Sequence, residues 1–174
     1  DGDVGGNAPH LTGLLGSTYA LAAEGWRLPM SAGFDTFPVR RDLPLVARVA
    51  QQGRVAVRSR LRLPLDRPLV LLSLGGFGAQ GLDWRAAADS IAGVADLVAT
   101  SYDAVEAGPH VHRVDEQLMT DAGLRYEDLV GAVDVVASKP GYGIISECAA
   151  NGTALLYTSR GRFREYDVLV NGMP

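Results

Sequence analysis

From residue 69 onward, short apolar runs and longer segments of mixed polarity follow one another regularly along the chain. Residues 69–74 form an apolar run, interrupted by one serine, that is typical of a strand buried on both faces. On similar runs, further strands are predicted at residues 95–100, 111–114, 133–137 and 153–158. Helices are predicted between and after them, at residues 84 onward, 126–132, 143–150 and 163–170. The alternation predicts an α/β fold with a doubly wound, Rossmann-like parallel sheet.

The first part of the chain lacks this regularity. Residues 1–25 are rich in glycine and small side chains without a firm period, and residues 27–47 carry proline-marked loops and short extended pieces. A short arginine-rich helix is predicted within residues 51–62, followed by a proline-rich turn. We therefore expect residues 1–67 to be a remnant of an N-terminal domain with an interdomain linker, and residues 68–174 to be the Rossmann-like domain. The missing Met and the missing closing helices predict a fragment.

Composition and charge narrow the class of protein. Apolar residues make up 47% and charged residues 21% of the chain, so a packed core can form. The net charge of -4 disfavours nucleic acid or an anionic membrane as the main partner. Eight arginines from Arg40 to Arg67 stand against only two aspartates, which favours a solvated linker helix over a basic patch for an anionic ligand. The single cysteine, Cys148, excludes an internal disulfide, and no apolar run has the length of a transmembrane segment, so we expect a cytoplasmic protein.

A glycine loop directly follows the first strong strand. Gly76, Gly78 and Gly81 fit the G-x-G-x-x-G spacing of dinucleotide-binding proteins, in which glycines let backbone amides approach a diphosphate. That fingerprint also needs an acid at the end of the second strand, whereas Asp96 stands within or before that strand. We expect Gly75, Gly76 and Gly78 to contact a ligand, with a tight strand-to-helix turn as the alternative.

A second glycine motif, at residues 138–147, carries more information. It runs from the end of a strand through a polar pair and a glycine turn into a helix. Amides at the start of that helix, together with its dipole, favour an anion, and Lys139 adds a positive charge. Glu147 stands one helical turn after Gly143, where its carboxylate can accept hydrogen bonds from both hydroxyls of a ribose. On spacing alone, a buried turn in which Glu147 satisfies the helix dipole is equally compatible.

These motifs resemble those of a known class of proteins. Residues 126–171, and more loosely 69–81, are similar to the C-terminal domain of GT-B glycosyltransferases, near the family 28 peptidoglycan N-acetylglucosaminyltransferases. The strings at residues 139–147 and 160–165 resemble more closely a glycosyltransferase-like module that occurs alone in bacteria and fused to plant arabinose and galactose kinases. By this resemblance Glu147 holds the ribose of a uridine nucleotide. The nucleotide-sugar-binding residues expected from the motifs and the resemblance are Gly75, Gly76, Gly78, Ser138, Lys139, Gly141, Tyr142, Gly143, Glu147, Arg160 and Glu165.

The resemblance implies transfer of a sugar from a UDP-sugar donor to a hydroxyl acceptor, without a tightly bound metal or other cofactor. The general base and the acceptor site would belong to the missing N-terminal half, so no catalytic residue is named and this chain alone is expected to bind without turnover. Arg160 and Glu165 replace the donor-sugar residues that transferases carry after the last strand, which leaves the sugar open. The alternatives are a non-catalytic sugar-nucleotide-binding regulatory module, an NAD-dependent oxidoreductase that uses the first glycine loop, and a nucleotide-sugar 2-epimerase.

Two histidines raise the question of a metal. His110 and His112 alternate on a predicted strand and therefore face the same side. Because the sequence shows no matched carboxylate or third ligand beside them, a metal site is not expected.

Overall fold

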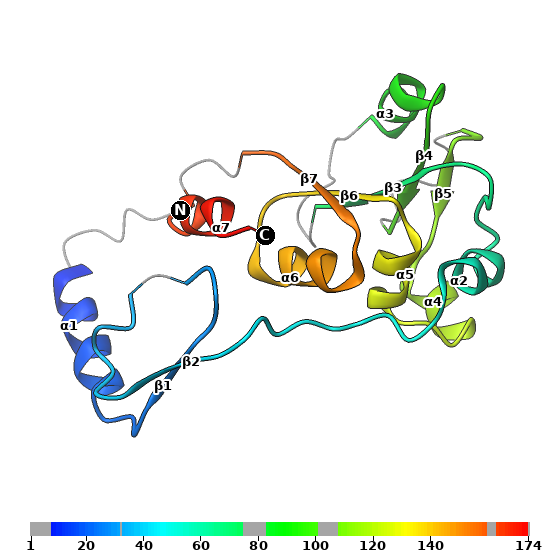
Figure 1. Ribbon diagram of the computed structural model, residues 1–174. Coiled ribbons are helices and arrows are strands. Elements are labelled where there is room, and N and C mark those ends of the chain that lie inside the picture. Colours follow the sequence, from blue (N-terminus) through cyan, green and yellow to red (C-terminus); the bar gives the residue numbers. More distant parts are fainter. Residues whose placement is uncertain (1–7, 32, 75–82, 101–107, 160–162, 174) are drawn as a thin grey trace. The chain divides into compact units, whose positions relative to one another are not determined.

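The computed structural model describes residues 8–31, 33–74, 83–100, 108–159 and 163–173 (Figure 1). The chain divides into two compact units, and each is described by itself. The first unit contains Asp1–Val46 and Arg160–Pro174, and the second contains Ala47–Ser159.

The second unit is built on a sheet of five parallel strands in the order β5-β4-β3-β6-β7. The strands are β3 (Leu69–Ser73), β4 (Asp96–Ala99), β5 (Val111–Arg113), β6 (Val135–Ser138) and β7 (Ala154–Tyr157). Leu71 of the central strand β3 stands opposite Val98 on one side and Val136 on the other, and all three side chains are fully buried. The predicted α/β fold with a parallel, Rossmann-like sheet is confirmed, because each predicted strand is present within a residue or two of its expected bounds.

Helices flank this sheet. They are α2 (Arg54–Arg60), α3 (Trp84–Ile91), α4 (Glu116–Asp121), α5 (Tyr126–Ala132) and α6 (Tyr142–Asn151). Asp83 caps α3 by accepting a hydrogen bond of 2.9 Å from the amide of Ala86, as its place before the helix suggests. The short helix α4 was not among the predicted elements, and Asp115 caps it in the same way through the amide of Leu118 at 2.8 Å.

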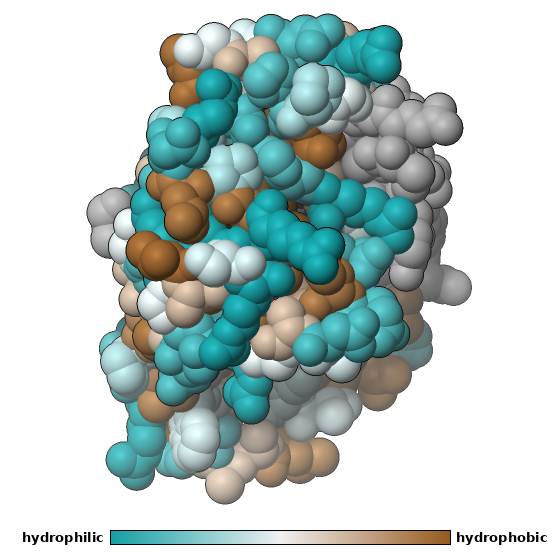
Figure 2. Space-filling model, turned by 90° about the vertical axis from the view of Figure 1, so that its right-hand side faces the viewer, coloured by the Kyte–Doolittle hydropathy of each residue, from teal (hydrophilic) through white to brown (hydrophobic). Residues whose placement is uncertain are grey.

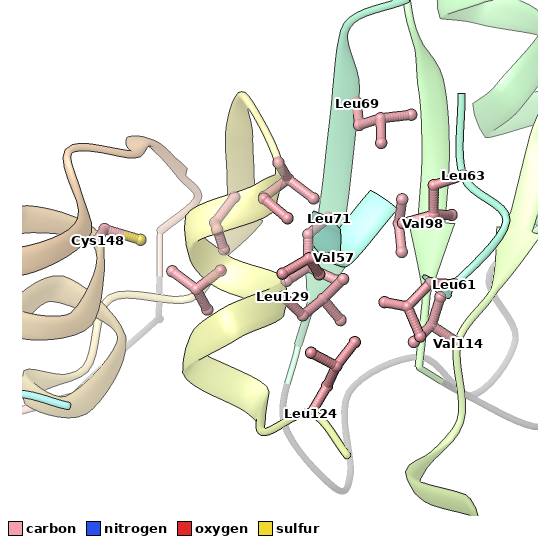
Figure 3. Packing of buried hydrophobic residues seen from close by; sticks show 14 residues of the cluster. Val57, Leu61, Leu63, Leu69, Leu71, Val98, Val114, Leu124, Leu129 and Cys148 are labelled. Atoms are coloured by element: carbon pink, nitrogen blue, oxygen red, sulfur yellow. The ribbon is translucent and has the colours of Figure 1, made fainter. Parts of the chain in front are cut away.

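The core of the second unit joins α2 to the sheet and to α5. Figure 3 shows Val57 of α2, Leu71 of β3 and Leu129 of α5 lying together, and all three are fully buried. Leu61, at the end of α2, is also buried in this cluster. Because α2 supplies part of the core, the compact unit begins at Ala47, whereas the sequence placed the start of the domain at residue 68.

Arg58 links α2 to the amino-terminal ends of the strands through hydrogen bonds. Its side chain is 4% exposed, and its Nη2 donates to Oδ2 of Asp134 at 2.8 Å. Its other donors bond the carbonyl oxygens of Ala132 at 2.7 Å, Pro64 at 3.2 Å and Arg67 at 3.0 Å. The expected solvated linker helix is therefore corrected at Arg58, whose side chain is buried and donates to these three carbonyls, whereas Arg54 and Arg60 of the same helix are exposed.

Asp134, just before β6, is the carboxylate that links α2 to β3. It accepts hydrogen bonds from the amide of Leu69 at 2.8 Å and from Nη1 of Arg54 at 2.5 Å, in addition to that from Arg58. Burial alone would raise the pKa of Asp134, but the bonds from Leu69, Arg58 and Arg54 outweigh it and hold the pKa below its ordinary value.

The first unit contains the helix α1 (Ala8–Tyr19), the parallel strand pair β1 (Gly25–Arg27) and β2 (Arg40–Asp42), and the helix α7 (Tyr166–Asn171). The ring of Tyr19 stacks on that of Phe37 with 5.5 Å between centroids. A Cβ at Gly25 would stand 2.5 Å from the Phe37 ring, so this close approach requires glycine. The helix α1 lies where the sequence showed no firm period, so it was not among the predicted elements. Within the described part of the chain, no helix combines the length and apolar character needed to cross a membrane.

Candidate functional site

The carboxyl-terminal edge of the sheet leads directly into α6. Strand β6 ends at Ser138, and Gly141 is the N-cap residue of α6 in an extended conformation, with φ of -155° and ψ of 149°. Its carbonyl accepts the amide of Ile145 at 3.1 Å, so the helix starts with a regular first turn. No side chain caps this end and no acid lies in its first turn. The positive end of the helix dipole thus meets no carboxylate of its own helix, as an anion site requires.

Gly143 lies in this first turn and is exposed. A Cβ placed on it would meet no atom within 4 Å, and its φ lies outside the left-handed region. Neither packing nor backbone conformation within the described residues requires glycine there. A glycine in open space at a helix start leaves the backbone accessible to a ligand.

Glu147 lies further along α6 and is 5% exposed. Because it falls outside the first turn of α6, it is not the first-turn acid of the alternative interpretation. Its Oε1 accepts a hydrogen bond of 2.6 Å from Nε of Arg48 and also contacts Nη2 of the same guanidinium. This bond raises the pKa of Arg48 above its ordinary value, against the lowering effect of burial. The carboxylate expected to hold a ribose is therefore present, and a cation lies on one of its oxygens.

A second carboxylate faces the same arginine. Glu127, in the first turn of α5, is 4% exposed, and its Oε2 lies 3.8 Å from Nη1 of Arg48. Arg48 itself is 62% exposed at its side chain. Two buried carboxylates, Glu127 of α5 and Glu147 of α6, thus face one accessible guanidinium.

Hydroxyl groups tie the strand ends to α5. The hydroxyls of Ser73 and Tyr126 are 2.6 Å apart, and Ser138 Oγ donates to the carbonyl of Ser73 at 2.5 Å. Burial raises the pKa of Tyr126 above its ordinary value, so its hydroxyl stays protonated at neutral pH. Ser73, Tyr126 and Arg48 were missed by sequence reasoning. The serine that ends the otherwise apolar run at 69–74 was the available signal for Ser73.

Cys148 is a buried thiol on α6. It is 2% exposed, and burial, followed by the charge of Glu147, raises the pKa of its thiol to about 11. A thiol of this kind is not a nucleophile at neutral pH.

The remaining expected site residues fall into three groups. Ser138 is buried and uses its hydroxyl proton inside the sheet, whereas Lys139 is exposed and Tyr142 half-buried beside Gly141. Glu165 is the N-cap residue of α7 and belongs to the first unit, so it is not placed relative to Glu147. The last group, Gly75, Gly76, Gly78 and Arg160, lies outside the described residues.

His110 and His112 both contact a carboxylate, that of Asp96, which the sequence pattern did not place beside them. Asp96, 3% exposed, accepts hydrogen bonds from the rings of His110 at 3.0 Å and His112 at 2.8 Å and from Nε of Arg67 at 2.9 Å. Asp96 is the first residue of β4, not the last, so it lies at the amino-terminal edge of the sheet, opposite the glycine turn. Across the described ranges, no group of three or more His, Cys, Asp or Glu side chains has an arrangement that could hold a metal ion.

The contacts of Asp96 predict a pH dependence of stability. Burial alone would raise the pKa of Asp96, but hydrogen bonds from His112 and His110 and the charge of Arg67 hold it below its ordinary value. A carboxyl with a lowered pKa in the folded state contributes stability above its unfolded pKa, about 3.9, and this contribution is lost as pH falls through the folded value. We expect Asp96→Asn to destabilise the chain at pH 7 and this deficit to shrink below about pH 4. Urea unfolding from pH 3 to 7 tests this, and a deficit that is independent of pH would contradict it.

Comparisons with known proteins find related sequences and solved structures of similar fold. The chain is 28% identical over 146 residues to L-arabinokinase of Arabidopsis thaliana, a match that covers 83% of this chain and 13% of that protein. It is 29% identical over 165 residues to the UDP-N-acetylglucosamine--N-acetylmuramyl-(pentapeptide) pyrophosphoryl-undecaprenol N-acetylglucosamine transferase of Clavibacter michiganensis subsp. michiganensis, covering 86% of this chain and 42% of that protein. No family model matches the chain.

The fold comparison agrees with the sequence comparison. The solved structure of the spinosyn forosaminyltransferase SpnP matches with a TM-score of 0.55 and 14% identity, covering 84% of this chain and 39% of that chain. The resemblance to GT-B glycosyltransferases is thereby confirmed, and the chain spans less than half the length of each of these proteins.

Proposed function

We propose that this chain binds a nucleotide-diphosphate sugar, with uridine as its base, as the donor-binding part of a glycosyltransferase. The observation that carries the proposal is the start of α6, where Gly141 and Gly143 open the helix end at the carboxyl edge of the sheet and Glu147 lies buried behind them. Ligands of parallel α/β sheets bind at this edge. The name of the Clavibacter relative, which includes a UDP-sugar, supports the same donor class.

The diphosphate would lie on the first-turn amides of α6. Charge builds up on the diphosphate as the sugar leaves, and the helix dipole and amides stabilise that charge, which makes a tightly bound metal unnecessary. Lys139 is exposed just before this turn and adds a positive charge. In the reaction, an acceptor hydroxyl oxygen forms a bond to the anomeric carbon while the bond from that carbon to the diphosphate oxygen breaks. The acceptor proton passes to a base outside the residues described here.

The ribose would use Glu147. Both contacts of Arg48 fall on Oε1, so a ribose hydroxyl can approach Oε2 while the ion pair remains. The chain spans 42% of the transferase relative, and in this proposal the acceptor site and the base would lie in other parts of a complete transferase. We expect this chain alone to bind the donor without turnover.

A non-catalytic regulatory module is the second candidate, and the L-arabinokinase match favours it. Both candidates predict nucleotide-sugar binding, and only the transferase predicts turnover. Assays of the full-length protein with a panel of hydroxyl acceptors separate them.

Parallel calorimetric titration with UDP, GDP and NAD tests the proposal. We expect UDP to bind more tightly than GDP, and NAD not to bind. NAD binding that survives changes in α6 would place the ligand on the first glycine loop and overturn the proposal. Binding of none of the three would also overturn it.

Gly143→Ala separates ligand contact from folding. Alanine is the better helix former by up to about 1 kcal/mol, and its methyl group would meet no atom of the chain, so the variant should be at least as stable as the wild type. The same methyl group stands where a diphosphate approaches the backbone, so UDP affinity should fall by roughly tenfold or more. Calorimetry and thermal unfolding measure the two effects.

Gly93→Ala is the matched control, because a Cβ there also meets no atom within 4 Å. It should leave UDP affinity unchanged. Equal UDP affinity in the wild type and Gly143→Ala would show that no phosphate lies on this turn.

A further inference from the structure

A concavity of the second unit lies at the β5 edge of the sheet, between the end of α2, the strand β5 and α4. This open concavity has a volume of about 600 Å³. Its lining residues are Arg60, Leu61, Arg62, Val111, His112, Arg113, Leu118, Asp121 and Ala122. Strands β4 and β3 separate β5 from β6, so this concavity is at least three strand spacings, about 14 Å, from the start of α6.

The charges around this concavity are unbalanced. Arg60 and Arg62 are exposed, and neither has an ion pair with any residue that the structure describes. Arg113 has an ion pair with Asp115, at 2.5 Å, and Asp121 accepts a hydrogen bond of 2.7 Å from Gln117. Figure 2 shows the side of the molecule that carries α2 and α4 in Figure 1, where hydrophilic residues surround isolated hydrophobic ones. The balance of charge over the concavity is positive.

The backbone at Arg62 adds an independent observation. Arg62 has a φ of 56°, in the left-handed region that favours glycine, directly after the C-cap residue Leu61 of α2. Its amide bonds the carbonyl of Ser59 at 3.2 Å, and the amide of Leu63 bonds that of Arg58 at 2.8 Å, as in a helix end that glycine usually forms. A charged side chain therefore occupies a disfavoured conformation at the rim of the concavity. Unfavourable backbone conformations of this kind concentrate at ligand sites.

We propose that this concavity binds a small organic phosphate, separately from the α6 site. Arg60 and Arg62 would hold the phosphate oxygens through charge-assisted hydrogen bonds. The apolar side chains of Leu61 and Leu118 would lie under the rest of the ligand. The site does not depend on the proposed function, because none of its residues belongs to the glycine turn or α6.

The competing explanation is that both arginines only complement the negative end of the α2 dipole. It predicts that replacing the two arginines lowers the stability of the fold, and that anions do not bind specifically at this face. The two explanations differ in what a titration with an anion shows at these residues.

Titration of the whole 15N-labelled chain with inorganic pyrophosphate, followed by amide chemical shifts, resolves the two sites. We expect a saturable shift of amides in residues 60–63 and 111–113, with its own dissociation constant. A chloride titration at equal ionic strength is run in parallel. Shifts only at residues 141–145, no saturation, or the same shifts with chloride would each overturn the proposal.

Arg60→Gln with Arg62→Gln should remove the shifts at the concavity and leave those at α6. Arg85→Gln is the matched control, because Arg85 is exposed on α3 and lines neither site. It should leave both sets of shifts unchanged.

Arg62→Gly keeps the test valid if the double variant folds poorly. Glycine suits the left-handed conformation, so the variant should be no less stable than the wild type. Loss of one charged hydrogen-bond donor should still weaken pyrophosphate binding at the concavity about tenfold. A variant with unchanged affinity would show that Arg62 serves only the helix end and would overturn the proposal.

Discussion

Replacing Arg58 with methionine is expected to lower the free energy of unfolding by about 3–5 kcal/mol. Methionine fills a similar volume but donates no hydrogen bond. The carbonyls of Ala132, Pro64 and Arg67 would lose their partner, and Asp134 would lose its bond to the buried guanidinium. Unpaired polar groups in buried surroundings have large desolvation penalties. Urea unfolding followed by circular dichroism measures the loss.

Arg60→Met is the control for this prediction, because Arg60 lies two positions later in α2 and is exposed. Its effect should remain within about 0.5 kcal/mol, as is usual at surface positions. Arg58→Lys tests the geometry, since a lysine cannot reach the same four oxygens as a planar guanidinium. If Arg58→Met is no worse than the control, water or side-chain rearrangement satisfies those carbonyls and the account of this linkage is wrong.

Glu147→Gln is expected to weaken UDP binding by roughly tenfold or more, because the charge-assisted hydrogen bond from a ribose hydroxyl to Oε2 would become a neutral one. Stability should change little, since the freed Arg48 is 62% exposed and can be hydrated. Calorimetric titration with UDP gives the affinity. Thermal unfolding of the same samples shows whether the fold is intact.

Glu127→Gln supplies the matched comparison. Glu127 is as buried as Glu147 and faces the same arginine, but it lies on α5 rather than behind the glycine turn. It should leave UDP affinity nearly unchanged. Equal losses in both variants would indicate that the charge around Arg48 matters and not a ribose contact, and an unaffected Glu147→Gln would remove Glu147 from the site.

The sheet could be predicted from the sequence because its strands are local signals. The apolar run at residues 69–74 can be recognised without knowledge of its tertiary contacts. In the same way, the glycines at 141, 143 and 152 mark the start and end of α6. The helices α1 and α4 were not found. The α1 segment contains glycines and exposed leucines with no clear apolar face, and α4 is only six residues long.

The site was predictable only where it is continuous in sequence. Gly141, Gly143 and Glu147 share one helix and its cap, so their closeness follows from the sequence, while their role as ligand contacts rests on the spacing and the resemblance and stays a prediction. Arg48 precedes Glu147 by 99 residues, and Asp96 meets its histidines across neighbouring strands. Contacts of this kind depend on the tertiary fold, and no local sequence pattern predicts them.

The linkage of α2 to the strands also bears on the order in which the unit can fold. Arg54 and Asp134 are separated by 80 residues, and the central strand β3 pairs on one side with β6, which follows it by more than half of the unit. During synthesis, β3 leaves the ribosome long before β6, one of its two partner strands, and before Asp134 can bind the arginines. Long-range pairing of this kind slows folding and leaves apolar strands open to aggregation meanwhile. A ribosome paused before residue 134 would therefore carry a nascent chain in which β3 can pair with β4 alone and its other edge remains open.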